Sequence, residues 1–467
     1  MNRAARAVKK TAGGKQPSAA KCVYMAALIL CAVFLMSACD SIVETSGPAQ
    51  NPNGEVAKAP LKEVKLPYDK GAGFDPNTTT SRYNLELCAL LYEPLVELAD
   101  GMKPQGGLAK DIKVSGSTVT LSLSKPLAAD VVSILGKMRS GGNYAVRLAN
   151  VISIETTGDF TVIITLLEPD ASFAANLNIP MTCAVGKYTL SDDKLLAAGD
   201  EILREIQLVH VQNDEEAAFA YRSGDLTAVT GMTGLRGKEY ATNNLVYIGT
   251  TLRDVSLRKA VSAALNRPEL IDDSLAVLGY VSLSPVHPDW YLYSSDIVAR
   301  GYDANYAKES LAGRTPKLRL LVCSDSSDKL NMAQSVAFQL KAASIDVQIL
   351  EYTRTAYMAA LESGGFDLYL GEVKIKPDMD LSALCHSAGV LNYGRLSISS
   401  VDAAFDAYKS RGTAEAAVEI IRALDDECPI IPLYYVIKEV AAPQQVLDVL
   451  TPTAANPFCG IENVHTQ

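Results

Sequence analysis

The spacing of apolar residues changes from helical to strand-like in the first part of the chain. Leu87, Cys88 and Leu91 recur at helical spacing. In Ser117–Ser124 apolar and hydroxyl residues alternate, which predicts a half-buried strand. A helix and two hairpin strands are predicted next, in the order Ala129–Met138, Val151–Glu155 and Phe160–Leu167. These patterns predict a small antiparallel sheet with one helix across residues 97–170.

Strand and helix patterns alternate along most of the remaining chain. A βαβ-like unit is predicted from a strand, a helix and a strand, Ile206–Val211, Glu215–Arg222 and Leu226–Val229. Later patterns read strand, helix, strand, helix, strand over Leu318–Cys323, Leu330–Ala343, Asp346–Leu350, Ala356–Ser363 and Phe366–Leu370. Two successive βα units favour a mostly parallel sheet covered by helices. Near the end, Pro429–Val436 predicts an apolar strand.

Composition and charge narrow the class of protein. The chain has 467 residues, of which 48% are hydrophobic and 21% charged, which suits a globular protein of two or three packed units. Its formal net charge is −10, and residues 1–38 carry basic but no acidic side chains, so the body is more acidic still. Because an acidic surface repels phosphate backbones, nucleic acid is excluded as the expected partner.

The N-terminal residues predict export. A basic, polar stretch over residues 1–21 precedes the apolar residues 22–38, which is the order of a secretory signal. The four residues Met36-Ser37-Ala38-Cys39 resemble a bacterial lipobox, in which cleavage occurs before the cysteine and that cysteine is lipid-modified. An uncleaved anchor is the alternative, but the apolar stretch is at the short limit for spanning a membrane. The Pro-, Gly- and Asn-rich residues 40–60 are then expected to form a flexible tether behind a palmitate-type anchor on Cys39.

Patterns for catalysis and metal binding are lacking in the sequence. There is no convincing GxSxG, HExxH or SxxK arrangement and no phosphate-binding loop, so we expect neither an enzyme nor a resident cofactor. No two of the four histidines have the spacing of metal ligands. The six cysteines beyond residue 60 are far apart, and they read better as small buried side chains than as a disulfide framework, although export permits either.

Six short stretches in a fixed order resemble the extracytoplasmic solute-binding lipoproteins of ABC importers, peptide/nickel-binding class. They are similar to the family's "LYEPLV", "PLTAEDVV", "AGEID", "VRQAISYAIDR", "GxFDL" and "PIIPLYY" elements. In this chain they lie at residues 91–96, 125–132, 221–226, 257–267, 365–368 and 429–435. The resemblance runs from about residue 61 to the C-terminus.

The resemblance implies a two-lobed, periplasmic-binding-protein-like α/β fold with an extra small subdomain and mixed sheets covered by helices. Lobe I would comprise residues 61–250, with the small subdomain inserted at about 97–170. Lobe II would comprise residues 251–436, and residues 437–467 would return to lobe I. A solute would bind in the cleft between lobes that close on it.

The implied function is capture of a small solute for an ABC import system. The partners would be the solute, expected to be a short peptide, the permease and ATPase subunits, and the membrane through the lipid on Cys39. The protein would act as a monomer on the outer face of the cell membrane. Two departures keep a solute-sensing or other non-transport binding lipoprotein open as the alternative. The region between Gly234 and Asp254 is short, and Gly371–Leu381 lacks the tryptophan and the early aspartate that peptide-binding members often place there.

Candidate ligand-binding residues lie in three loops. Glu372, Asp378 and Asp380 follow the strand Phe366–Leu370, where ligands of such sheets bind, although they can instead form a solvated loop or pair with nearby lysines. Tyr393 and Arg395 occupy a second loop and could either contact the solute or form a surface turn. Trp290, the only tryptophan, can stack on a solute or pack at the edge of a lobe.

Overall fold

The first lobe is built on a sheet that joins the start of the chain to its middle. The computed structural model describes residues 61–467 apart from 233, 236, 273–277 and 298, so the expected signal segment, Cys39 and the tether lie outside it. The sheet has the order β1-β12-β11-β10, and its strands are Val64–Tyr68, Glu205–His210, Lys194–Ala197 and Tyr188–Ser191. Strand β1 pairs with β12 in parallel.

The end of the chain packs into the same core as this sheet. Helix α2 (Arg82–Leu91) contributes Leu87, Leu90 and Leu91 to a buried cluster that includes Val64 and Leu66. The C-terminal segment, with helix α13 (Gln444–Leu447) and the short helix η4 (Ile461–Asn463), adds further apolar side chains, Val446, Leu450, Phe458, Ile461 and Val464. One core therefore unites the two ends of the described chain.

The predicted βαβ-like unit is right for its first two elements and wrong for the third. Helix α4 (Asp214–Ser223) follows β12 and ends at Gly224, which has a φ of 84°. Strand β13, however, is only Val229–Thr230 and pairs with a different sheet. The reason is that Thr227 binds the edge of β1, where the Lys65 N–H donates to its hydroxyl at 2.9 Å, while Leu226 is buried beside α4.

The inserted subdomain is the small antiparallel sheet with a helix that the sequence predicts. Its sheet has the order β5-β6-β8-β7, over Ala109–Ser115, Thr118–Leu123, Thr161–Leu166 and Val151–Thr156. Helix α3 (Ala128–Ser140) covers it and the short helix η2 (Ala145–Leu148) lies beside α3. Two strand pairs flank it, namely β2 (Tyr92–Pro94) with β9 (Pro180–Val185) and β3 (Val96–Ala99) with β4 (Lys103–Gly106). The short helices η1 (Asp100–Met102) and η3 (Phe173–Leu177) complete the subdomain.

The second lobe contains the parallel strands that the sequence predicts. Strand β16 (Lys317–Cys323) pairs in parallel with both β17 (Asp346–Tyr352) and β18 (Leu368–Lys374). Helices α8 (Ser327–Ala342) and α9 (Arg354–Ser363) connect these strands. The other helices are α5 (Val255–Ala263), α6 (Arg267–Asp272), α7 (Ala304–Ser310), α10 (Ser382–Cys385), α11 (Ser399–Arg411) and α12 (Ala414–Glu427).

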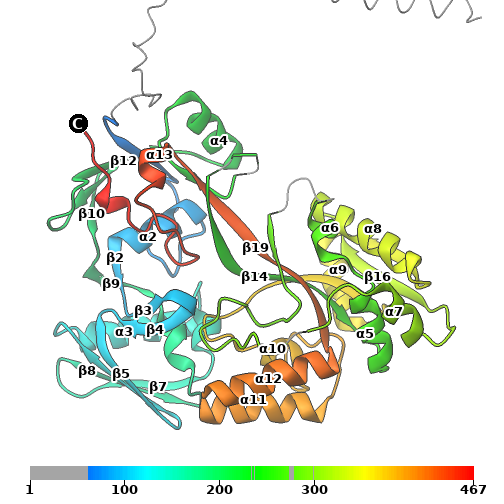
Figure 1. The fold of residues 1–467 in the computed structure, drawn as a ribbon. Coiled ribbons are helices and arrows are strands. Elements are labelled where there is room, and N and C mark those ends of the chain that lie inside the picture. Colours follow the sequence, from blue (N-terminus) through cyan, green and yellow to red (C-terminus); the bar gives the residue numbers. More distant parts are fainter. Residues whose placement is uncertain (1–60, 233, 236, 273–277, 298) are drawn as a thin grey trace, which may run out of the picture. The chain divides into compact units, whose positions relative to one another are not determined.

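Two long antiparallel strands run between the lobes (Figure 1). They are β14 (Lys238–Thr250) and β19 (Ile430–Ala441). Strand β14 also pairs with β18, and β19 pairs with β13 and β15 (Gly279–Val281). The full sheet order is β13-β19-β14-β18-β16-β17. We refer to β14 and β19 as the crossing strands. The sequence predicts the first half of β19 but not β14.

Candidate functional site: a pocket on the crossing strands

Side chains of the crossing strands alternate between two separate cores. Leu245, Tyr247 and Tyr435 pack with α9–α12, whereas Val246 and Tyr434 pack with α5–α8. This alternation is the period of two expected of a strand buried on both faces. The face that carries Val246 and Tyr434 is the one on which a pocket opens, at the edge of the cover that α8 provides.

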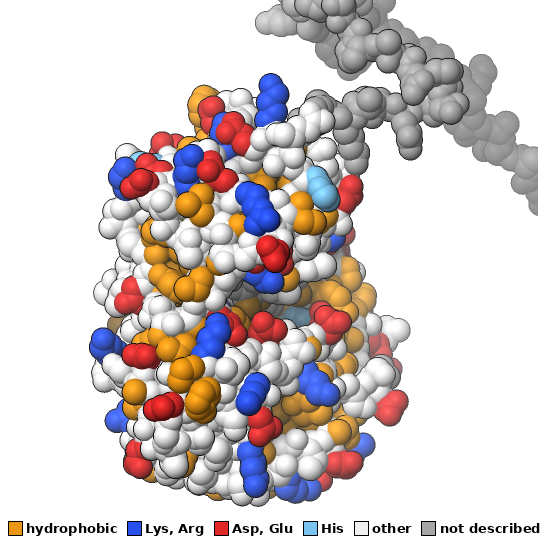
Figure 2. All heavy atoms as spheres, turned by 90° about the vertical axis from the view of Figure 1, so that its left-hand side faces the viewer, with side chains coloured by type: hydrophobic (Ala, Val, Ile, Leu, Met, Phe, Trp, Pro, Cys, Tyr) orange, Lys and Arg blue, Asp and Glu red, His pale blue; other side chains and the backbone are white. Residues whose placement is uncertain are grey.

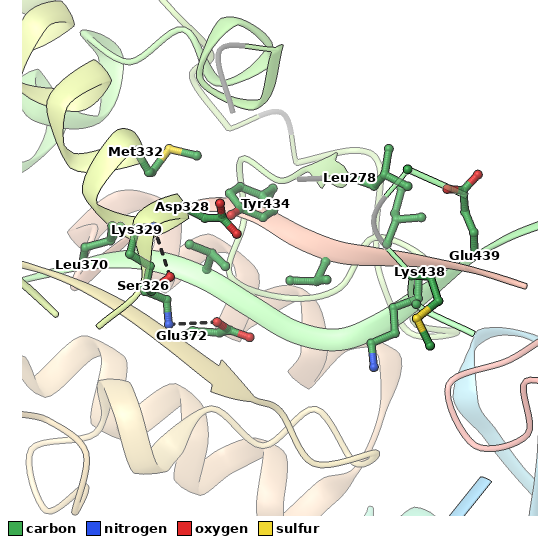
Figure 3. A pocket seen from close by; sticks show the side chains of 16 residues that line it. Leu278, Ser326, Asp328, Lys329, Met332, Leu370, Glu372, Tyr434, Lys438 and Glu439 are labelled. Carbon is green, nitrogen blue, oxygen red and sulfur yellow. Dashed lines mark hydrogen bonds and ion pairs between the residues drawn. The ribbon is translucent and has the colours of Figure 1, made fainter. Parts of the chain in front are cut away.

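The pocket has a volume of about 370 Å³, and the crossing strands that join the two lobes form part of its lining. That volume lies within the range of sites that bind small molecules. Its lining residues come from the loop before β14, from the residue before β15, from the crossing strands, from β18 and from the start of α8. They are Gly231, Met232, Gly234, Val246, Leu278, Ser326, Asp328, Lys329, Met332, Leu370, Glu372, Tyr434, Val436, Ile437, Lys438 and Glu439 (Figure 3).

One polar group of the pocket is fixed by several partners. The Glu372 carboxylate lies 3.0 Å from the Lys329 ammonium and accepts a hydrogen bond of 3.1 Å from the Asn244 side-chain amide. Burial opposes ionisation of Glu372, but these partners outweigh it, so the pKa of Glu372 lies below its ordinary value. Glu372 is therefore an ionised, oriented hydrogen-bond acceptor on the floor of the pocket.

Three polar groups of the pocket make no hydrogen bond or ion pair among the described residues. They are the Lys438 ammonium, the Tyr434 hydroxyl and the Asp328 carboxylate, all drawn in Figure 3 without a dashed line. Tyr434 is only 6% exposed, but its hydroxyl is not among the buried side-chain atoms of the described chain that lack a partner, so water or a solute in the pocket can reach it. Met332, Leu370 and Val246 supply apolar wall between these groups. The pocket thus combines apolar contact with unpaired groups of both charges.

Of the residues predicted as ligand contacts, Glu372 lines this pocket. Asp378 and Asp380 lie in the loop that follows β18, in a buried cluster with Lys376. The Lys376 ammonium is 3.2 Å from Asp378 and 3.1 Å from Asp380, which lies 3.9 Å from Lys409 on α11. Burial opposes the ionised form of Asp380, but the two lysines lower its pKa to about 2.

This buried cluster connects the inserted subdomain to the second lobe. The Asn176 side-chain amide, from η3, donates to Asp378, and the Ala171 N–H donates to the Lys409 carbonyl at 2.9 Å. Asp170 lies at the same contact, where burial and the nearby Asp378 carboxylate raise its pKa to about 6. A further backbone bond of 2.9 Å joins the Tyr291 N–H to the Gly101 carbonyl. We call these bonds the subdomain contact.

The remaining predicted contacts lie away from the pocket lining. Trp290 is 5% exposed and packs edge-on against Tyr291 and Tyr408. Tyr393 packs edge-on against Tyr369, with ring centroids 6.1 Å apart. Arg395 is exposed, and its guanidinium donates to the Glu362 carbonyl at 2.7 Å. The structure therefore places Glu372 on β18, Asp378 and Asp380 in the loop after that strand, and these three side chains elsewhere in the second lobe.

Lys438, Tyr434, Asp328 and Lys329 are pocket residues that the sequence analysis missed. A signal existed for Tyr434, which is one member of the Tyr434-Tyr435 pair in the predicted last strand, with one tyrosine on each face. For Asp328 and Lys329 the signal is their place in the first turn of a predicted βα unit, where the carboxyl end of β16 meets α8. Nothing in the pattern indicates that these segments, about a hundred residues apart, share a pocket.

Metal chemistry has no evident basis in the described part of the chain. No group of three or more His, Cys, Asp or Glu side chains there is arranged to hold an ion. The six cysteines that the structure describes are all free, and Cys428 is buried as expected while Cys323 is half-buried. Within the same residues, no helix is both long and apolar enough to cross a membrane.

Comparison with known proteins agrees with this architecture. Residues 193–390 match the sequence model described as bacterial extracellular solute-binding proteins, family 5 Middle. No curated protein sequence matches the chain significantly.

Three solved structures are similar to the chain at low sequence identity. The ABC transporter substrate binding protein CtaP from Listeria monocytogenes is 18% identical with a TM-score of 0.69, over 87% of this chain and 100% of that one. The oligopeptide-binding protein AppA from Bacillus subtilis, solved with a nonapeptide, is 18% identical with a TM-score of 0.60, over 88% and 100%. NikA from Brucella suis, solved with Fe(III)-EDTA, is 16% identical with a TM-score of 0.67, over 87% and 100%.

The resemblance and the fold class expected from the sequence are thus confirmed. The described chain has the two-lobed α/β fold of periplasmic binding proteins, and its residues 193–390 match the model of family 5 of the bacterial extracellular solute-binding proteins, a family of binding proteins rather than enzymes.

Proposed function

We propose that the protein is a membrane-anchored, extracytoplasmic receptor that captures a small solute, a short peptide, for an ABC importer. The observation that carries the proposal is the pocket on the crossing strands, which combines apolar walls with unpaired polar groups. The crossing strands line the pocket and also join the two lobes. A solute bound there can therefore change the angle between the lobes. Hinge closure around a ligand is the established behaviour of this architecture.

A short peptide is the solute class that the chemistry of the pocket favours. The volume of about 370 Å³ suits a solute of a few residues rather than a long chain. Lys438 and Asp328 offer unpaired groups of opposite sign, as a zwitterion requires, and Met332 and Leu370 offer apolar contact. The similar protein from Bacillus subtilis is named for oligopeptides, which supports this class by analogy.

Within this proposal the residues predicted as ligand contacts have different roles. Glu372 would contact the solute directly, because it lines the pocket and is held ionised. Asp378 and Asp380 would act at the subdomain contact, where they pair with Lys376. Trp290, Tyr393 and Arg395 could contact a solute only if it extends beyond the pocket, and we propose no role for them in holding a small one.

Anchoring through a lipid on Cys39 is the second part of the proposal. Its support is the order of basic, apolar and small residues before Cys39, followed by a tether with little apolar content. We expect the intact protein in the membrane fraction of its host and the Cys39→Ala variant outside that fraction. Equal membrane association of both proteins would contradict the anchor and leave solute capture untouched.

Native mass spectrometry of residues 41–467, purified gently as a monomer from the natural host, tests solute capture. A co-purified peptide would establish the class and identify the solute. If the protein is empty, a thermal-shift screen follows, in which a solute at a hundredfold excess over Kd should add about 2.7 kcal/mol to the free energy of unfolding. Failure of every solute to shift the melting temperature would count against capture.

A solute sensor without transport is the second candidate. It is motivated by the altered Gly371–Leu381 stretch, in which the lysine and two aspartates form a buried cluster rather than a pocket wall. The two candidates differ in uptake: deletion of the gene should abolish import of the identified solute in a receptor and leave import unchanged in a sensor.

A further inference from the structure

The inserted subdomain and the second lobe meet closely around the start of η3. The Ala171 N–H donates to the Lys409 carbonyl at 2.9 Å, and the Asn176 side-chain amide donates to the Asp378 carboxylate. A Cβ atom at Gly412, which follows α11, would lie 2.4 Å from the Ala171 Cβ, so the two surfaces touch there. This part of the subdomain contact also carries several charged side chains.

Asp170, the residue before Ala171, is a buried carboxylate without a cationic partner. Its side chain is almost fully buried, since the residue is only 4% exposed. Its hydrogen bonds come from the N–H and the hydroxyl of Ser172, at 3.1 and 2.9 Å, and both of these donors are neutral. Within the described part of the chain Asp170 makes no ion pair, because the lysines nearby pair with other residues. The ionised form of a buried carboxylate that lacks a counter-charge is costly.

The charged groups of the second lobe that face Asp170 already pair with one another. In the loop after β18, the Lys376 ammonium lies 3.2 Å from Asp378 and 3.1 Å from Asp380. Lys409 of α11 lies 3.9 Å from Asp380. Two carboxylates and two lysines therefore balance within the second lobe, and the closed contact adds the carboxylate of Asp170 to this set.

Two other titratable side chains lie at this contact and do not change their charge near neutral pH. The Tyr408 hydroxyl of α11 lies near Asp170, and burial raises its pKa, so it stays neutral. Arg147 of η2 approaches Asp378 from the subdomain, and its guanidinium keeps its proton at every accessible pH. Burial and the nearby Asp378 raise the pKa of Asp170 to about 6. Asp170 is thus the group of the contact that titrates close to neutral pH.

We infer that closure of the inserted subdomain on the second lobe takes up a proton at Asp170, so that acidic conditions favour the closed arrangement. The paired lysines and aspartates all belong to the second lobe and stay together when the lobes separate, whereas Asp170 moves away with the subdomain. Regulation of closure by protons goes beyond solute capture and does not depend on which solute is captured.

The direction of the pH effect follows from the two environments of Asp170. In the open form Asp170 is away from Asp378 and reached by water, so it binds a proton less tightly than in the closed form. Closure is therefore favoured most below about pH 4, where Asp170 carries the proton in both forms. It becomes weaker as the pH rises toward 6, the pKa of Asp170 in the closed contact.

The distance between the lobes of the lipid-free protein, residues 41–467, measured against pH without added solute, tests this inference. Two dyes are attached by bioorthogonal chemistry in place of Lys113 in the subdomain and Lys341 in the second lobe, both exposed. Thiol-directed dyes are avoided because the six described cysteines are free. Energy transfer between the dyes and small-angle X-ray scattering both report closure. We expect the ratio of closed to open protein to be about tenfold higher at pH 4.5 than at pH 7.5, which corresponds to about one pKa unit between the two forms.

Variants on both sides of the contact assign the effect. Asp170→Asn removes the titrating group and should be closed at both pH values to the extent that the parent is closed at pH 4.5. Asp378→Asn acts from the other lobe and should reduce the pH response, because Asp170 then meets one carboxylate fewer. The matched control is Asp159→Asn, which removes an exposed carboxylate of the same subdomain and should keep the full response. Thermal unfolding of each variant at both pH values establishes that it is folded.

The outcomes separate this inference from the proposed function. A distance between the lobes that is the same at pH 4.5 and pH 7.5 would overturn the inference and leave solute capture intact. A full pH response in Asp170→Asn would also overturn it, because another group would then take up the proton. An unchanged response in Asp378→Asn would overturn the coupling across the contact. If the pH response is found but no solute shifts the melting temperature, capture fails and the inference stands.

Discussion

Two tyrosines of the sheet between the lobes lie over glycines of the neighbouring strand. Tyr247 of β14 is directly opposite Gly371 of β18, and Gly249 is opposite Tyr369. A Cβ atom at Gly371 would lie 2.7 Å from the Tyr247 ring, and one at Gly249 would lie 2.0 Å from the Tyr369 ring. Both tyrosines are almost fully buried, so neither ring has room to move aside. The glycines are required by close packing on the sheet face opposite the pocket.

Gly249→Ala and Gly371→Ala are therefore expected to destabilise the protein. Each should lower the free energy of unfolding by about 1–3 kcal/mol, the usual cost of overpacking a core, with the larger loss at Gly249. Denaturant unfolding monitors this directly. Gly136→Ala is the control, since Gly136 lies within α3 with open space around its Cα, and there alanine should be neutral or stabilising. A loss at Gly136 equal to that at Gly249 would contradict the argument.

The raised pKa of Asp170 predicts that the free energy of unfolding falls as the pH rises from about 4 to about 6. Burial and the nearby Asp378 raise its pKa to about 6, so the folded protein binds this proton more tightly than the unfolded chain, in which the pKa is about 4. Stability from this group is hence greatest below pH 4 and is lost as pH rises toward 6. Asp170→Asn can keep the hydrogen bonds from the Ser172 N–H and hydroxyl, which are 3.1 and 2.9 Å long.

We expect Asp170→Asn to be more stable than the parent at pH 7.5, by about 2 kcal/mol, and to match it at about pH 3.5, where Asp170 is protonated in both the folded and the unfolded chain. Urea unfolding at both pH values provides the measurement. A difference that does not change with pH would show that packing rather than the charge of Asp170 is responsible.

At the scale of elements, the sequence predicts the helices and strands whose apolar residues recur at regular spacing within the segment itself. The parallel strands of the second lobe, α8, α9 and the inserted antiparallel sheet all follow from spacing of two or of about 3.6 residues. Strand β14 was missed because Asn243, Asn244 and Gly249 interrupt its apolar run. It forms a strand because β18 and β19 pair with it on both sides, and that support comes from chain more than 100 residues away.

The capping contacts at the start of α4 can be tested by mutation. The Asn213 side chain accepts from the Glu216 N–H at 2.9 Å, and the Glu216 carboxylate accepts from the Gln212 N–H at 2.8 Å. These reciprocal bonds satisfy two backbone donors at the helix start. Asn213→Ala should cost about 1 kcal/mol of stability.

Thr353→Ala is the matched control for this cap. Thr353 occupies the same position at the start of α9, but its side chain makes no capping hydrogen bond. Calorimetric melting of both variants should show a lower Tm for Asn213→Ala and little change for Thr353→Ala. Equal losses would mean that the capping bond of Asn213 contributes nothing specific.

At the scale of the whole described chain, the subdomain contact decides how the inserted subdomain meets the second lobe. Figure 2 shows acidic and basic side chains mixed on one face of the molecule, around a hollow at mid-height. Gly101 of the subdomain has a φ of 71°, and its carbonyl accepts from the Tyr291 N–H of the second lobe. A Cβ at Gly101 would lie 2.8 Å from the Asp289 carbonyl oxygen, which is too close.

Gly101→Ala should weaken the subdomain contact and favour separated lobes. We expect a larger radius of gyration in small-angle X-ray scattering, together with weaker solute binding, because the closed arrangement is less populated. Gly158→Ala is a close control: Gly158 also has a φ of 71°, but nothing lies within 4 Å of the added Cβ. Both variants carry the same backbone strain, so an equal change in radius would rule out the contact as its cause.

The candidate site was predictable only where one segment carries the information. Glu372 was found because acidic residues after a strand of a parallel sheet are a local pattern. Lys438, Tyr434 and Asp328 were not found, because their place in one pocket depends on tertiary contact between distant segments. The sequence offers both Lys374 and Lys376 as partners for the acidic residues beside them, and in the structure Lys376 pairs with Asp378 and Asp380.

The shared core of the two chain ends has a consequence for the order of folding. Val64 and Leu66 of β1 pack in one cluster with Phe458, Ile461 and Val464, so that core is incomplete until almost the last residue has been synthesised. The helices and parallel strands of the second lobe, by contrast, come from one continuous stretch of chain, α5 to α12. Contacts between distant residues form late because closing a long loop costs chain entropy. A nascent chain would therefore build its middle first and join its ends last, and the lobe that begins the sequence would be the last to become stable.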